Sequence, residues 1–227
     1  MALIEIKNLN KIYNTIAVPV HAVKDVNLLI DKGEFTAVVG PSGSGKTTLL
    51  NIIGGLDKPT DGQVIIDGRD ITKLSDSKMV DYRLKNIGFV FQSYNLIPVL
   101  TARENIEFIM LLQGENKQKR DERATELLKA VGLGDRIDTR PAMLSGGQQQ
   151  RVAVARALAS KPSFVLADEP TANLDSASAE SLLDMMEELN KKYDMTFIFS
   201  THDSRVMKRA RRIITLVDGK IADDKKS

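Results

Sequence analysis

Residues 35–53 of this 227-residue chain read FTAVVGPSGSGKTTLLNII. The first five of them, Phe35–Val39, form a short apolar run of the kind found in buried strands. Lys46–Ile53 has the composition of a helix and is followed by Gly54-Gly55, which would end it. Between the two, Gly40–Thr47 matches the pattern G-x-x-x-x-G-K-[ST], with the strand before it and the helix after it that the pattern requires. This stretch therefore predicts a loop that binds the phosphate groups of a nucleoside triphosphate.

The residue types of this loop explain why it would bind phosphate. Glycines let the backbone turn so that successive N–H groups point at phosphate oxygens, and the following helix adds the positive end of its dipole. We expect Lys46 to reach the β- and γ-phosphates and the Thr47 hydroxyl to bind Mg²⁺. The residues predicted to contact the nucleotide here are Gly40, Pro41, Ser42, Gly43, Ser44, Gly45, Lys46, Thr47 and Thr48.

A second candidate element is the pair of acids that follows the apolar run Phe164–Ala167. Asp168 ends this predicted strand, where its carboxylate can hold Mg²⁺ through water. Glu169 comes next and is the candidate general base for an attacking water. Taken alone, the two acids are equally compatible with exposed residues that open a loop. The presence of the phosphate-binding loop in the same chain favours the catalytic interpretation.

The segment Leu144–Gln148, with the sequence LSGGQ, narrows the class further. Ser145 and Gln148 have the spacing of a capping box, so a helix is expected to begin here. Gly146 and Gly147 in its first turn would leave backbone N–H groups accessible to a second anion. Two phosphate-binding elements about a hundred residues apart suggest a nucleotide held between two copies of the chain.

Strand-like runs alternate with helical stretches, which favours an α/β fold with a largely parallel sheet. Ser163–Ala167 and Thr196–Ser200 are two further runs of the buried-strand type. By contrast, Asp67-Gly68 and Asp218-Gly219 each lie between apolar runs and favour tight antiparallel hairpins. Thr101–Ala159 has helical periodicity, so we expect a helical lobe inserted into the sheet core.

Composition excludes several classes of protein. The chain has no cysteine, which excludes disulfides and thiolate metal sites, and its net charge of +2 is far from that of a dedicated nucleic-acid binder. No apolar run approaches the roughly 20 residues of a membrane-spanning helix, and the start lacks the apolar run of a secretory signal. We therefore expect a soluble chain. The basic run at 205–212 fits either a solvated helix face or proximity to anionic lipid.

These motifs, in this order, resemble the ABC (ATP-binding cassette) ATPase family, and the resemblance covers essentially the whole chain. It implies a P-loop NTPase fold with a RecA-like, mostly parallel sheet core, an N-terminal antiparallel β subdomain and an inserted helical subdomain. We expect a single domain over residues 1–227. Its nucleotide-binding core would comprise residues 1–92 and 162–227, and the helical lobe residues 93–161.

The resemblance also implies roles for residues that their own sequence context leaves open. Tyr13, otherwise an ordinary strand aromatic, looks like the side chain on which adenine stacks. Gln92, otherwise an ordinary loop glutamine, sits where the family has a glutamine that contacts Mg²⁺ and the attacking water. His202 follows the Thr196–Ser200 run and resembles the family's switch histidine, which contacts the γ-phosphate. Ser145, Gly146, Gly147 and Gln148 resemble the segment that grips the nucleotide of the opposite subunit, and Asn173-Leu174-Asp175 resembles a loop that crosses the dimer interface.

One subgroup of the family has a similar insertion at Thr15–Ala22 and a similar sequence over residues 165–175. It contains the ATPases of macrolide exporters, lipoprotein-releasing systems, antimicrobial-peptide transporters and the cell-division ABC pair. The implied ligands are ATP and Mg²⁺. The implied partners are a second copy of the chain on ATP binding and a separate integral-membrane permease, docked near Gln92–Leu100, without nucleic acid. The implied location is the cytoplasmic face of the cell membrane, peripheral through the permease.

Other readings fit the sequence less well. A soluble ABC ATPase without a transport role usually carries a long coiled coil or a second cassette, and neither is present. A GTPase would need Asn-Lys-x-Asp, whereas Asn190–Asp194 has one residue too many. A purely structural nucleotide-binding module is disfavoured by Glu169.

Overall fold

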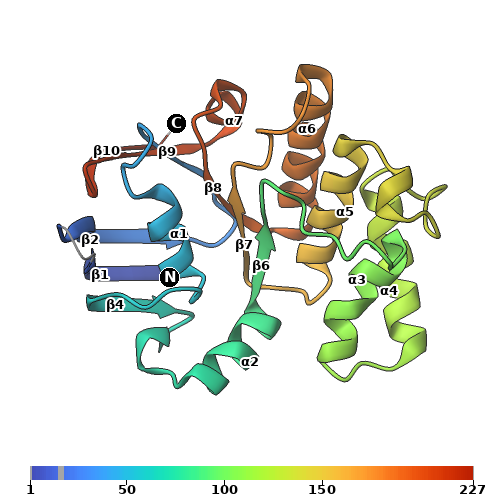
Figure 1. Cartoon of the computed structure of the whole chain (residues 1–227), viewed down its shortest axis with the longest axis horizontal. Helices are drawn as coiled ribbons and strands as arrows, with labels where there is room; N and C mark the ends of the chain where they lie inside the picture. The colour runs from blue at the N-terminus through green and yellow to red at the C-terminus, as the bar shows by residue number, and fades with distance from the viewer. Residues whose placement is uncertain (1, 15–17, 227) are drawn as a thin grey trace.

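The computed structural model describes residues 2–14 and 18–226, and its strands form two sheets (Figure 1). The smaller, antiparallel sheet has the strand order β2-β1-β4-β5, so that β1 lies between β2 and β4. Its strands are β1 (Ala2–Tyr13), β2 (Val20–Asp31), β4 (Asp61–Ile66) and β5 (Arg69–Asp70).

The larger, central sheet has six strands in the order β10-β9-β3-β8-β7-β6. The strands from β9 to β6 are parallel to one another, and only β10 runs antiparallel to its neighbour β9. These strands are β3 (Phe35–Val39), β6 (Ile87–Val90), β7 (Phe164–Asp168), β8 (Thr196–Ser200), β9 (Arg212–Val217) and β10 (Lys220–Lys226). Because β3, β6, β7 and β8 are parallel, their carboxyl ends meet at one edge of the sheet.

The helices fall into two groups along the chain. Three of them lie between β6 and β7 in the sequence and gather at the side of the molecule away from the antiparallel sheet (Figure 1). These are α3 (Ala102–Leu112), α4 (Lys117–Ala130) and α5 (Gly146–Leu158). The others are α1 (Lys46–Ile53), α2 (Asp76–Asn86), α6 (Ser176–Tyr193) and α7 (Ser204–Arg209), with short 3₁₀ turns at Ile71–Lys73 and Pro141–Met143.

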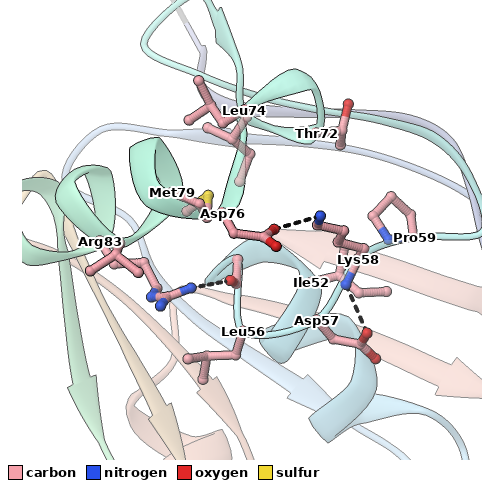
Figure 2. A pocket seen from close by; sticks show the side chains of 13 residues that line it. Ile52, Leu56, Asp57, Lys58, Pro59, Thr72, Leu74, Asp76, Met79 and Arg83 are labelled. Carbon is pink, nitrogen blue, oxygen red and sulfur yellow. Dashed lines mark hydrogen bonds and ion pairs between the residues drawn. The ribbon is translucent and has the colours of Figure 1, made fainter.

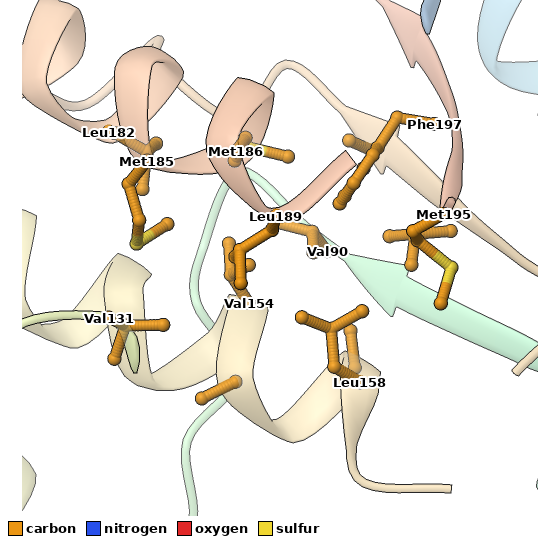
Figure 3. Close-up of a cluster of buried hydrophobic side chains, with 14 of the residues drawn as sticks. Val90, Val131, Val154, Leu158, Leu182, Met185, Met186, Leu189, Met195 and Phe197 are labelled. Carbon is orange, nitrogen blue, oxygen red and sulfur yellow. The ribbon is translucent and has the colours of Figure 1, made fainter. Parts of the chain in front are cut away.

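Side chains of the central sheet alternate between two hydrophobic cores, as the pleat of a strand requires. In β8, Phe197 and Phe199 pack in the core formed with α5 and α6, whereas Ile198 packs in the core formed with α1 and the antiparallel sheet. Figure 3 shows the first core, where Leu158 of α5 and Leu189 of α6 lie on the same side of the sheet as Phe197. Since α1 is enclosed between the two sheets, the loop that joins it to β3 is fixed at both ends.

The predicted fold class is confirmed, and most elements end within a residue of their expected bounds. Phe35–Val39 and Thr196–Ser200 are strands, and Lys46–Ile53 is a helix. Both Asp-Gly pairs form hairpin turns in which the two residues have positive φ, for example +49° at Asp67 and +75° at Gly68. The insertion predicted at Thr15–Ala22 lies partly outside the described residues, because residues 15–17 are not among them.

The basic run at 205–212 spans the helix α7 and the start of β9, and three of its five cations are paired with acids. Arg205 is paired with Asp203, and Arg209 is paired with Glu180 and Asp184. Arg212 is buried and paired with acids of its own chain. These cations therefore serve internal contacts, which disfavours the interpretation as a lipid-binding surface.

No helix in the described part of the chain is long and apolar enough to cross a membrane.

Candidate nucleotide-binding site

The loop between β3 and α1 has the conformation that its glycines predict. Gly45 caps α1 with a φ of +100°, and a Cβ atom there would collide with the carbonyl oxygen of Ala22. The side chain of Lys46 is buried, and its ammonium group donates to the carbonyl oxygens of Gly40 at 2.9 Å and Pro41 at 3.0 Å. Lys46 is thus already directed along the loop, with its charge close to the backbone that precedes the helix.

A pocket of about 730 Å³ opens over this loop. Residues from the antiparallel sheet, the loop itself and the carboxyl ends of the central strands surround it. They are Tyr13, Val20, Ala22, Gly40, Pro41, Ser42, Gly43, Gly45, Lys46, Thr47, Thr48, Gln92, Glu169, Ala172 and His202. The structure therefore brings together the predicted phosphate, adenine and catalytic residues, although the chain between Tyr13 and His202 is almost two hundred residues long. The exception is Ser44, which is buried and does not line the pocket.

The oxygen atoms expected at a magnesium site lie together at one side of this pocket. The Thr47 hydroxyl donates to Asp168 Oδ1 at 3.2 Å, so the start of α1 and the end of β7 are in direct contact. Hydroxyl and carboxylate oxygens are the ligand types that Mg²⁺ prefers, with phosphate oxygens and water completing its shell. Among the described residues, no group of three His, Cys, Asp or Glu side chains could hold a metal ion by itself. A Mg²⁺ at this site would therefore depend on phosphate and water oxygens as further ligands.

Glu169 is held in a defined position next to the phosphate loop. Its backbone has a φ of +46°, which is uncommon for a residue other than glycine, and its N–H donates to the carbonyl of Ser200 at 2.9 Å. Its carboxylate accepts from the Thr201 hydroxyl at 3.1 Å and from His202 Nδ1 at 2.7 Å. The His202 side chain is 76% exposed, whereas that of Glu169 is 18% exposed. A carboxylate oriented in this way can accept a proton from a water placed beside it.

Gln92 lines the pocket just beyond the end of β6. The Gln92 Nε2 lies 3.5 Å from Asn173 Oδ1, and the Asn173 Nδ2 donates to the Gln92 carbonyl at 3.0 Å. The loop that follows Glu169 therefore contacts the loop that carries Gln92. The Tyr94 hydroxyl adds a longer contact of 3.4 Å to the Asn173 carbonyl.

Tyr13 ends β1 at the rim of the pocket, with its ring fixed from one side. Its hydroxyl donates to Asp57 Oδ2 at 2.7 Å, and the Lys11 ammonium lies 4.7 Å from the ring centre. Partial burial, together with the neighbouring Asp57 carboxylate, raises the pKa of the Tyr13 hydroxyl above its usual value. The tyrosine thus stays protonated and presents an aromatic face whose orientation is already set.

The segment Ser145–Gln148 lies outside this pocket. Ser145 caps α5 with the predicted capping box: its Oγ accepts from the Gln148 N–H at 3.3 Å, and the Gln148 side chain accepts from the Ser145 N–H at 2.9 Å. A Cβ atom on Gly146 would lie 2.8 Å from the Tyr94 hydroxyl, so a larger residue there would have to displace the Tyr94 side chain. Asp175 likewise lies outside the pocket and caps α6, accepting from the Ser178 N–H at 2.9 Å.

Some residues at the site were missed by the sequence analysis. Thr201 contacts Glu169, and its position directly after the β8 run was the available signal. Val20, Ala22 and Ala172 line the pocket through the shape of the backbone, for which the sequence carries no signal.

The family follows from comparison with known proteins. Residues 23–172 match the family model described as ABC transporter. This chain belongs to the ABC transporter family. It is 46% identical over 96% of its length to an ABC transporter ATP-binding protein of Thermotoga maritima, covering 92% of that protein. It is also 46% identical to the ATP-binding protein MJ0796 of Methanocaldococcus jannaschii, with 99% of this chain and 97% of that protein covered.

A solved structure of an ABC protein agrees in fold along the whole chain. The ATP-binding cassette MJ0796 in a dimeric, post-hydrolysis state bound to ADP and phosphate has a TM-score of 0.89, with 44% sequence identity and 98% of both chains covered. The macrolide export ATP-binding/permease protein MacB of Hyphomonas neptunium is 46% identical over 98% of this chain, which spans 34% of that longer protein. The predicted resemblance to ABC ATPases that include macrolide exporters is thereby confirmed.

This ABC protein has a second hollowed surface beside α2. Two pockets of about 410 and 440 Å³ share Leu56, Val80 and Arg83 at their common border. Figure 2 shows the first pocket, where Arg83 donates to the Gly55 carbonyl and Lys58 pairs with Asp76. The second pocket extends between β6 and α3, and its lining is mostly apolar. Its residues include Ile87, Phe89, Phe91, Asn95, Ile97, Phe108 and Ile109.

Proposed function

We propose that two copies of this ABC protein enclose two molecules of Mg·ATP, hydrolyse them, and thereby drive a separate membrane permease. One observation carries the catalytic part of this proposal. Glu169 is held by Thr201 and His202 at the wall of the same pocket that contains Lys46 and Thr47. A candidate base and a phosphate-binding loop in one pocket are what ATP hydrolysis requires.

In this proposal Glu169 accepts the proton of the attacking water, and His202 orients Glu169 and contacts the γ-phosphate. Lys46 and the N–H groups of the loop neutralise the developing charge on the phosphate. Thr47, Asp168 and Gln92 would hold Mg²⁺, which supplies further neutralisation of phosphate charge when it is bound. The present Lys46 contacts with two backbone carbonyls would be exchanged for contacts with phosphate oxygens.

The second copy of the chain would complete the site. Ser145–Gln148 lies at the start of α5, outside the pocket of its own chain, and the capping box leaves the N–H groups of Gly146 and Gly147 unused. Head-to-tail pairing would carry this segment, and Asp175 with it, to the γ-phosphate bound by the other copy. The dimeric state of the 44% identical cassette supports this arrangement. Hydrolysis would remove the bridging phosphate and let the two copies separate.

The hollow between β6 and α3 would receive the permease. Apolar side chains such as Phe89 and Phe108 line it, and it adjoins the Gln92 loop through Phe91 and Asn95. A helix of the permease seated there would sense the position of Gln92, and this would link hydrolysis to movement in the membrane. The permease would hold the chain at the cytoplasmic face of the cell membrane as a peripheral subunit. Residues 1–227 would form a single ATPase domain. Relatives named for macrolide export favour an exporter.

Phosphate release tests the catalytic proposal. Wild-type protein should release phosphate from ATP in the presence of Mg²⁺. Glu169→Gln should lower kcat at least about a hundredfold while ATP affinity stays within about threefold, because only the base is removed. Lys46→Ala should weaken ATP binding itself. Glu169→Gln with wild-type kcat would exclude Glu169 as the base.

A further inference from the structure

A buried glutamine on α5 connects three parts of the protein that the proposed mechanism treats separately. Gln150 has no exposed surface, although it lies only two residues beyond the capping box. Its Nε2 donates to the carbonyl oxygen of Pro170 at 2.7 Å and to that of Phe91 at 3.2 Å. Its Oε1 is buried without a hydrogen-bond partner among the described residues. Burying an unpartnered acceptor costs free energy, so packing alone does not explain a glutamine here.

The two carbonyl groups belong to the loops that carry the candidate catalytic residues. Phe91 directly precedes Gln92 at the end of β6, and Pro170 directly follows Glu169 at the end of β7. Since β6 and β7 are neighbouring parallel strands, the loops leave the sheet side by side. One nitrogen atom of Gln150 therefore holds both loops at positions one residue away from a side chain of the site.

The same helix holds the Gln92 loop at a second point. The Arg156 guanidinium donates to the Tyr94 carbonyl at 2.8 Å, on the other side of Gln92 from Phe91. Among the described residues, the bond from Gln150 is the one hydrogen bond that joins the Glu169 loop to α5. The start of α5 is Ser145–Gln148, which the proposed dimer presents to the partner's nucleotide.

We propose that Gln150 is a positioning residue: its amide keeps Gln92 and Glu169 in register with each other and with the start of α5. This inference rests on the proposed function. A movement of α5, as when Ser145–Gln148 engages the nucleotide of the other copy, would be passed to the Glu169 loop through Gln150 and to the Gln92 loop through Gln150 and Arg156. The amide suits this role because its single nitrogen carries two N–H donors, one for each carbonyl. Methionine has a similar size and no donor.

The decisive variant is Gln150→Met in the full chain, with Gln113→Met as its matched control. Gln113 is partly buried, and its Nε2 donates to the Leu84 carbonyl at 3.0 Å. In the described part of the chain it has no hydrogen bond to either catalytic loop. Gln150→Met should lower kcat for phosphate release about tenfold to a hundredfold, as expected when catalytic groups shift by about 1 Å. KM and the Kd for ATP should stay within about threefold. Gln113→Met should keep kcat within about twofold.

Hydrogen–deuterium exchange of the same variants tests the positioning directly. Gln150→Met should speed exchange in residues 91–95 and 169–175 and leave β7 and β8 unchanged, whereas Gln113→Met should leave both loops unchanged. A wild-type kcat in Gln150→Met, or a kcat that falls only in proportion to the folded fraction, would overturn the proposal. Gln150→Ala repeats the test with less bulk, and failure of both variants to fold would assign Gln150 to stability alone. If wild-type protein released no phosphate, the proposed function would fail, and the exchange result would still decide whether Gln150 holds the loops.

Discussion

Tyr13 illustrates how a single side chain of the pocket is prepared for its ligand. The Asp57 carboxylate fixes its hydroxyl and the Lys11 ammonium covers its ring from one side, while Lys11 itself donates to Asp57 at 2.6 Å. Because these three groups restrain one another, the ring loses little further freedom when a base stacks on it. The role of Tyr13 as the adenine platform is a proposal that follows from this geometry.

Replacing the ring separates stacking from the hydroxyl contact. Tyr13→Ala should weaken ATP binding by about 1–3 kcal/mol, the usual contribution of one base stacked on an aromatic ring. Tyr13→Phe keeps the ring and should bind ATP within about threefold of wild type. Titration with a fluorescent ATP analogue measures both affinities. An alanine variant that binds as tightly as wild type would exclude Tyr13 from the adenine site.

Among the elements, α7 depends on the residue that follows His202. Asp203 caps this short helix, and its carboxylate accepts from the Arg205 guanidinium and from the Thr171 hydroxyl at 2.6 Å. Thr171 lies in the loop after Glu169, so Asp203 joins the two loops that meet at the site. The Arg205 guanidinium, with help from Thr171, lowers the pKa of Asp203 to about 2.

This lowered pKa gives stability a defined dependence on pH. The unfolded carboxyl titrates near its ordinary value of 3.8, so its contribution is complete above about pH 4 and is lost as the pH falls towards 2. Between pH 5 and pH 3 wild-type protein should therefore lose about 1 kcal/mol of unfolding free energy through this group. Asp203→Asn retains a side-chain oxygen that can cap α7 but has no carboxyl to titrate. Its unfolding free energy should therefore fall by about 1 kcal/mol less than that of wild type between pH 5 and pH 3. Urea unfolding at several pH values compares the two, and parallel losses would contradict the assignment.

Local patterns predicted the elements, whereas long-range contacts had no signal in the sequence. The phosphate loop, the capping box at Ser145 and the Asp67-Gly68 turn were predicted because each depends on residues close in the chain. The sheet order was not predicted, because pairing between β3 and β8 joins residues far apart in sequence. The burial of Gln150 was missed for the same reason: its two acceptors lie on other elements.

At the scale of the whole molecule, Arg212 joins the two sheets. Its guanidinium donates to the Leu29 carbonyl of β2 at 2.7 Å, to Glu34 at 3.0 Å and to Asp224 of β10 at 2.7 Å. Its side chain is only 7% exposed, and these acids raise its pKa further above its usual value. The partners Leu29 and Glu34 lie almost two hundred residues away in sequence, so the basic run alone could not indicate this contact.

Breaking this contact should destabilise the whole fold. Arg212→Leu would leave Glu34, itself only 13% exposed, with the exposed Lys226 as its remaining ion-pair partner, and should lower the unfolding free energy by about 3 kcal/mol. Arg136→Leu is the control, because the Arg136–Asp135 pair is exposed and its loss should cost less than about 1 kcal/mol. Chemical denaturation measures both, and equal losses would show that the Arg212 contacts do not stabilise the fold more than an exposed ion pair does.

The central claim is that two copies of the chain share each ATP, and one measurement tests it most directly. Light scattering gives the mass of Glu169→Gln in saturating Mg·ATP, where hydrolysis can no longer release the phosphate that joins the copies. We predict the mass of two chains for Glu169→Gln with ATP and the mass of one chain without nucleotide. Adding Ser145→Arg, which would obstruct the contact between the copies, should give the mass of one chain even with ATP. A Glu169→Gln protein that stays monomeric in saturating ATP would contradict the shared site.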